Sequence, residues 1–259
     1  MLPREHGAYS QMALPLATSL VIAGPSPPAL LLALAVVCGF LAHEPLVLLL
    51  GGRGARALNA TQSRATVWFA VTVVAMVAAG AAAVRFTPAA VRWSLLLPLV
   101  PAAWVGAGAF TRQEKQASTQ IAVALAFALA TIPICLGAGI ERATAISIAF
   151  VFASVYVTGV LCVRTIVLRK RGGGNPSASR AARRALVCIV FGSTLTIGVA
   201  VVWAWTRWPS LVAALPGLAT AVMLGLRRSP PPLKTVGWSL ALTSAAAALI
   251  LIGTLMHRV

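Results

Sequence analysis

Nine long apolar segments, separated by short polar connections, make up most of the chain. They run approximately over Tyr9–Ala23, Pro28–Leu50, Ala65–Val84, Val91–Ala109, Thr119–Leu136, Ala143–Leu168, Ala182–Trp205, Ser210–Leu226 and Val236–Met256. A helix needs about 20 apolar residues to cross a bilayer, and the segments lack the two-residue alternation of a membrane β-barrel. The sequence therefore predicts an all-α fold. We expect a polytopic membrane helix bundle of about nine transmembrane helices, forming a single integral membrane domain over residues 1–259.

The charge composition excludes a water-soluble domain. Of the 259 residues, 59% are hydrophobic and only 10% are charged, whereas about 25% are charged in a typical soluble domain. The formal net charge is +17, and the four acidic residues include no aspartate. Most basic residues lie in short connections between apolar segments, as in inner-membrane proteins. We therefore expect the lipid bilayer as a partner and no nucleic acid.

The basic residues are divided unequally between the two ends of the predicted helices. Fifteen lysines and arginines fall on the side that holds the N-terminus and five fall on the other, while Arg164 lies inside a segment. Connections rich in lysine and arginine stay in the cytoplasm. The sequence thus predicts a protein of the bacterial cytoplasmic (inner) membrane with a cytoplasmic N-terminus and, after nine spans, an external C-terminus.

A histidine and a carboxylate stand side by side inside the second apolar segment, at His43 and Glu44. A charged group near the centre of a membrane helix costs roughly 2.5 kcal/mol or more, and Pro45 favours a kink beside the pair. An intramembrane ionisable pair indicates a functional site that faces a cavity. We expect Glu44 to face the interior and to meet a cation or donor, foremost Arg164, His6 or Lys115, because an unpaired buried charge is costly.

Other polar residues are predicted on the same side of the membrane. The candidate ligand-binding residues are Arg4, Glu5, His6, Arg112, Glu114, Lys115, Tyr156 and Arg164. Tyr156 and Arg164 are eight residues apart and thus lie roughly on one helix face. Together with His43 and Glu44 they would line a pocket open to the cytoplasm. Its ligand would be an amphiphile with an anionic head, met by Arg112, Lys115 and Arg164.

Each of these residues also has a structural interpretation. Arg164 could reach the headgroups along its apolar stem, the Arg112–Lys115 connection could be solvated, and Glu5 could cap the first helix. The basic stretch Arg169–Arg180 could rest on anionic headgroups or cover a cytoplasmic site. His43 and Glu44 could simply lock helix packing.

The sequence does not predict a metal site. Two histidines and two glutamates on the cytoplasmic side could ligate zinc or iron, but no helix-spaced pair such as HExxH is present. The four cysteines lie in apolar segments without a CxxC spacing, which is typical of helix packing. No cofactor follows from the residues.

Two resemblances add to this interpretation. The opening Pro3-Arg4-Glu5-His6-Gly7, with His43-Glu44-Pro45-Leu46, the Arg112–Lys115 connection, and Tyr156 with Val163-Arg164, resembles the YwiC-like family of bacterial integral membrane proteins. Nine helices with polar motifs in the second and sixth also look like the UbiA-type prenyltransferases. That resemblance implies a UbiA-like helix arrangement and an isoprenoid-like ligand.

The UbiA resemblance does not extend to the metal chemistry. Those enzymes bind Mg²⁺ and a prenyl diphosphate through Asp-rich motifs, and this chain has no aspartate. Mg²⁺ needs oxygen ligands, so we expect no Mg²⁺-dependent prenyl transfer here.

Three kinds of function remain open. In an enzyme, Glu44 or His43 would be the general base and Arg164 would stabilise negative charge. In a proton-coupled transporter, His43 and Glu44 would relay protons. In a non-enzymatic assembly partner, the chain would support other membrane complexes.

Overall fold

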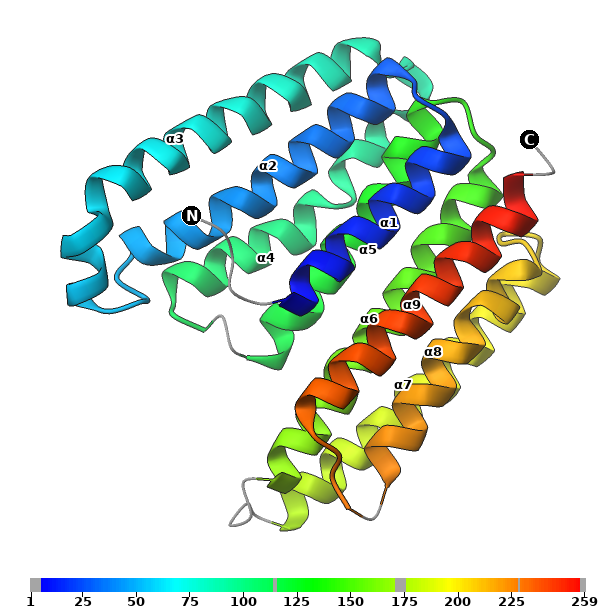
Figure 1. Ribbon diagram of the computed structural model, residues 1–259. Coiled ribbons are helices and arrows are strands. Elements are labelled where there is room, and N and C mark those ends of the chain that lie inside the picture. Colours follow the sequence, from blue (N-terminus) through cyan, green and yellow to red (C-terminus); the bar gives the residue numbers. More distant parts are fainter. Residues whose placement is uncertain (1–5, 114–115, 171–175, 228, 257–259) are drawn as a thin grey trace. The chain divides into compact units, whose positions relative to one another are not determined.

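The structure is a computed structural model that describes residues 6–113, 116–170, 176–227 and 229–256. Within these residues the chain is helical (Figure 1). The elements are α1 (His6–Ala23), α2 (Pro27–Leu49), α3 (Ala55–Phe86), the 3₁₀ helix η1 (Ala89–Leu96), α4 (Leu99–Phe110), α5 (Ala117–Gly137), α6 (Arg142–Lys170), α7 (Pro176–Val202), α8 (Pro209–Leu226) and α9 (Leu233–Leu255).

The prediction of a polytopic all-α membrane bundle is confirmed. Among the described residues, eight helical stretches are long and apolar enough to cross a membrane, and Ala8–Ala23 is a shorter apolar helix. Large apolar side chains are exposed along α3, where Val67, Val71 and Val74 are 57–67% exposed. An apolar stripe of this extent is stable only against lipid or another apolar surface, so the spans contact the bilayer.

The fourth predicted span is not one regular helix. It consists of η1, a short connection and α4, with Pro98 and Pro101 near the junction. Proline has no N–H to continue the α-helical ladder, and Leu97 N–H bonds Ser94 O at 3.1 Å in the tighter 3₁₀ pattern. The predicted Val91–Ala109 span is therefore present within Ala89–Phe110, but its first part is 3₁₀ rather than α-helix.

The third helix is also longer than predicted. It begins at Ala55 rather than Ala65. Most of the added residues are polar, and they include alanine, glutamine and arginine, which favour helix. A search for apolar segments finds the part of a helix that meets lipid and misses a polar extension beyond it.

The helices form two compact units, Met1–Ile140 and Glu141–Val259. Whether both belong to a single integral membrane domain stays a prediction. In unit 1, α2 lies beside α3, and α5 packs against α1, α2 and α4. About two thirds of the membrane-spanning part of α5 is buried, whereas 17% of the corresponding part of α3 is buried. Helix α5 is thus the centre of unit 1 and α3 its periphery.

In unit 2, α6 packs against α7, α8 and α9. Small residues recur every fourth position along α8, at Ala213, Gly217, Ala221 and Gly225, and all four are buried. Such a stripe lets membrane helices approach closely. The approach is tight: a Cβ added at Gly217 would lie 2.8 Å from Val155 Cγ1.

Helix ends in both units share one hydrogen-bond pattern. After α2, Gly51 has φ +75° and the N–H groups of Gly51 and Gly52 bond Leu48 O and Val47 O. This is a Schellman motif, in which a residue in the left-handed conformation closes the helix. The same pattern follows α4, α5 and α7, with Arg112, Gly139 and Ala204 in the left-handed position.

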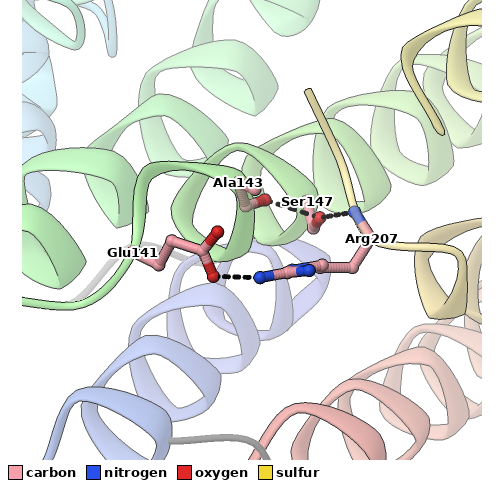
Figure 2. A network of polar contacts seen from close by, with 4 residues as sticks. All are labelled: Glu141, Ala143, Ser147 and Arg207. Atoms are coloured by element: carbon pink, nitrogen blue, oxygen red, sulfur yellow. Dashed lines mark hydrogen bonds and ion pairs between the residues drawn. The ribbon is translucent and has the colours of Figure 1, made fainter. Parts of the chain in front are cut away.

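A polar network fixes the connection between α7 and α8 to the start of α6 (Figure 2). The guanidinium of Arg207 pairs with the Glu141 carboxylate. Arg207 N–H donates to Ser147 Oγ at 2.7 Å, and that hydroxyl donates to Ala143 O at 2.7 Å. Because Glu141 directly precedes α6, the network joins three helix ends of unit 2.

Candidate ligand-binding site at the end of α2

His43 and Glu44 lie near the C-terminal end of α2 rather than at its middle. The helix runs through Pro45 and ends at Leu49, five residues after Glu44. At 1.5 Å per residue this places Glu44 about 7.5 Å from the helix end. The Glu44 side chain is 14% exposed, and His43 is half-buried. The pair therefore lies close to the end of a span, where a charge costs less than at mid-membrane.

Arg53 is the partner of Glu44. Its Nε donates to Oε1 at 3.0 Å and its Nη2 to Oε2 at 2.7 Å. Two parallel charge-assisted bonds of this kind are among the stronger polar contacts in proteins. We expected Arg164, His6 or Lys115 in this position. The side chains of His6 and Lys115 lie outside the described residues, and the carboxylate is instead paired within its own helical hairpin.

The turn after α2 makes this pairing possible. Gly51 and Gly54 have φ values of +75° and +89°, which residues with a Cβ rarely adopt. Gly54 N–H also bonds Gly51 O at 3.0 Å. The tight turn places Arg53 beside the last turns of α2, so its side chain reaches Glu44 across nine residues of sequence.

Arg112 reaches the same helix end from α4. Its Nη2 donates to Leu50 O at 3.4 Å, and a Cβ added at Gly51 would lie 3.5 Å from that nitrogen. The last carbonyls of a helix have no donors within the helix and carry partial negative charge. An exposed guanidinium beside them is therefore favoured. Arg112 also holds the left-handed conformation, with φ +58°.

The site formed by Glu44, Arg53 and Arg112 carries a net positive charge. The Arg53 guanidinium occupies both oxygens of the Glu44 carboxylate, while the Arg112 guanidinium donates to Leu50 O. Glu44 can act as a general base or a proton relay only if Arg53 moves away. Without such movement, the arrangement suits binding of an anion better than proton transfer.

The other predicted site residues are divided among several places. Tyr156 is buried in α6, with its ring centroid 5.6 Å from that of Phe152. Arg164 is exposed on the same helix, so the two side chains do not share one environment. Both belong to unit 2. Arg4, Glu5, Glu114 and Lys115 lie outside the described residues, as does the side chain of His6.

The sequence contained a signal for Arg53 that we did not use. Gly51-Gly52-Arg53-Gly54 places an arginine among glycines directly after an apolar segment. Glycine is enriched just past helix ends, so the motif indicates a tight turn that folds the arginine back on the helix.

A pocket of about 490 Å³ is lined by residues 59–64, 67 and 68 near the start of α3 and includes none of the predicted site residues. Among the described residues, no group of three or more His, Cys, Asp or Glu side chains could hold a metal ion.

Fold and site together define the class of this chain: a multi-pass α-helical membrane protein with a cationic site at a helix end. A family model described as "YwiC-like protein" matches residues 2–135. The chain therefore belongs to the YwiC-like family, and the matched region contains Glu44, Arg53 and Arg112. Neither the curated proteins nor the solved structures contain a match to the chain. The UbiA-like helix arrangement stays a prediction.

Proposed function

We propose that the chain is a bacterial inner-membrane protein that binds the anionic head of an amphiphile, such as a lipid or an isoprenoid-like molecule, at the end of α2. Arg53 and Arg112 contact the head, and the adjoining apolar helix faces contact the tail. The distribution of lysine and arginine predicts the orientation of the chain in the membrane. The N-terminus and the site face the cytoplasm, and the C-terminus is external.

The observation that carries the proposal is the convergence of two guanidinium groups at one helix end. In the described part of the chain, Glu44 is the carboxylate that pairs there, and it balances Arg53. Arg112 has a backbone carbonyl as its described partner. Its remaining donors can meet phosphate or carboxylate oxygens in the planar geometry that arginine favours.

The backbone of Arg112 supports the same conclusion. A residue with a Cβ in the left-handed conformation costs roughly 1–2 kcal/mol, and glycine occupies the equivalent position after α2 and α5. Strain of this kind often occurs at functional sites. The guanidinium at this position supplies a binding group that glycine would lack.

Glu44 has a positioning role in this proposal. Its bidentate contact fixes the plane of the Arg53 guanidinium at the end of α2. No described contact of Glu44 favours a catalytic role over this one.

The test compares two ion pairs within the described residues, Glu44–Arg53 and Glu141–Arg207. Arg53→Gln removes the cation of the candidate site, and Arg207→Gln removes the cation of the Glu141 pair as a matched control. Amphiphiles that co-purify with each protein in neutral detergent are identified and counted by mass spectrometry. We expect Arg53→Gln to lose an anionic amphiphile that wild type and Arg207→Gln retain. Equal retention by all three proteins would refute the proposal.

A further inference from the structure

Unit 2 ends in a second cluster of cations, formed by different helices from those of the α2 site. We propose that this basic end of unit 2 binds the headgroups of anionic phospholipids in the bilayer. The inference is carried by residues of unit 2 alone and does not depend on the proposed function.

Two arginines gather the ends of three helices at this place. Arg169 of α6 donates from Nη1 to Gly225 O at 3.4 Å, and Arg183 of α7 donates from Nη2 to Leu226 O at 2.9 Å. Both acceptors belong to the last turn of α8, whose carbonyls lack donors within the helix. The ends of α6, α7 and α8 therefore meet here.

An apolar cluster beneath the arginines includes the start of α9. Its buried members are Cys162, Ile166, Leu186, Ala221, Leu224 and Val236. Because Val236 lies in the first turn of α9, Lys234 is placed at the same end. The position of the cation cluster is thus fixed by packing as well as by hydrogen bonds.

The charged side chains at this end of unit 2 are cations. Its cations are Arg164, Arg169, Lys170, Arg180, Arg183, Arg184, Arg227 and Lys234. The sole acidic residue of positions 141–259 in the sequence is Glu141, and it pairs with Arg207 at the opposite end of α6. The sequence of positions 141–259 offers no second acidic side chain to balance the cluster, which favours an external anion as its complement.

The neighbouring surface indicates that this anion is a lipid headgroup. Arg184 is exposed on α7, and Val187, Phe191 and Leu195 follow it at helical spacing on the same face. These three apolar side chains are 45–70% exposed. The cations thus end where a lipid-facing surface begins, which is the level of phosphate groups in a bilayer. Basic residues at this level attract anionic lipids.

The test measures binding of phosphatidylglycerol and phosphatidylcholine to the purified full-length chain in neutral detergent, by native mass spectrometry. Arg184→Gln, Arg227→Gln and Lys234→Gln are combined, since these side chains are exposed and are not the ones that donate to the carbonyls of Gly225 and Leu226. Each charge near the surface contributes about fivefold in affinity, so the triple variant should lose on the order of a hundredfold for phosphatidylglycerol at this end. Phosphatidylcholine binding should not change.

A matched triple variant, Arg85→Gln, Arg92→Gln and Arg142→Gln, removes the same charge from the other helix ends and should bind as wild type does. Equal losses in both triple variants, or no loss in the first, would overturn the proposal. Displacement of phosphatidylglycerol by inorganic phosphate at constant ionic strength would also overturn it in favour of a soluble anion.

One measurement is independent of the variants. Binding of phosphatidylglycerol to the wild-type protein should weaken as salt rises, because exposed charges are screened. Salt-independent binding would contradict a headgroup site of this kind, even if the triple variant failed to fold.

Discussion

Two residues with a Cβ hold the left-handed position that closes a helix, Arg112 after α4 and Ala204 after α7. The backbone hydrogen bonds are of the same type in both places, but the side chains differ in what they contribute. Arg112 places a guanidinium at the end of α2, whereas Ala204 contributes a methyl group. Comparing the two positions separates the cost of the conformation from the value of the side chain.

At Ala204 we expect replacement by glycine to stabilise the fold. Ala204→Gly removes a steric cost of roughly 1–2 kcal/mol and adds unfolded-state entropy of roughly 0.5–1 kcal/mol. The free energy of unfolding should rise by about 1 kcal/mol, measured by reversible denaturation in detergent. A decrease would show that the left-handed conformation at this position carries no strain.

Glu44→Gln should lower the free energy of unfolding by roughly 1–3 kcal/mol, because it leaves the Arg53 guanidinium with a neutral partner. The control is Glu141→Gln. The Glu141 side chain is 57% exposed, so this change should cost about 0–1 kcal/mol. Equal effects of the two substitutions would show that the Glu44–Arg53 pair is no stronger than an ordinary surface pair.

At the scale of elements, helix packing in unit 2 depends on the small residues of α8. The Val155 side chain occupies the space above Gly217, with Cγ1 and Cγ2 at 2.8 and 2.9 Å from an added Cβ. The close approach of α6 and α8 therefore requires glycine at this position. Gly253 of α9 has no atom within 4 Å of an added Cβ and provides the comparison.

Gly217→Ala should destabilise the protein by about 1–3 kcal/mol through overpacking against Val155. Gly253→Ala should be neutral or stabilise by up to about 1 kcal/mol, because alanine favours the helix. Thermal unfolding of both variants in the same detergent checks the difference. If Gly217→Ala is as stable as Gly253→Ala, then α6 and α8 are not held at the distance described.

The elements also show what the sequence could and could not predict. The lengths of the apolar segments predicted where the helices lie, because a helix must be long and apolar to cross lipid. These lengths did not predict the 3₁₀ helix before Pro98 or the polar start of α3. Of the predicted site residues, Glu44 lies near the end of α2 and Arg112 donates to Leu50 O just after it, and their functional role stays a prediction. The partner Arg53 was missed because its position depends on a turn with two left-handed glycines, which apolar patterns do not describe.

At the scale of the whole molecule, the two cationic sites belong to one predicted side of the membrane. The α2 site lies at the end of α2 and α4, and the unit 2 cluster lies at the end of α6 and α8. Both sets come from connections counted on the basic side of the chain. The orientation of the chain therefore decides whether both sites meet the cytoplasm.

Reporter fusions test this orientation. A reporter inserted within residues 172–175 should be active in the cytoplasm, and a reporter fused after Val259 should be active outside, because the basic connections remain in the cytoplasm. Alkaline phosphatase and green fluorescent protein serve as the complementary pair. A cytoplasmic C-terminus, or an external connection at residues 172–175, would contradict the predicted topology.

The most direct test of the central claim, that the end of α2 binds an anionic amphiphile, is the substitution Arg112→Gly. Glycine fits the left-handed backbone better than arginine, so stability and binding are expected to respond in opposite directions. Ala204→Gly provides the control, since it relieves the same strain without removing a charge. Both variants and the wild type are examined for unfolding temperature and for bound amphiphile per protein in the same sample.

We predict that Arg112→Gly unfolds at or above the wild-type temperature and binds the anionic amphiphile on the order of tenfold more weakly, because one charged donor group is lost. Ala204→Gly should bind as the wild type does. Wild-type binding by a stable Arg112→Gly protein would contradict the claim.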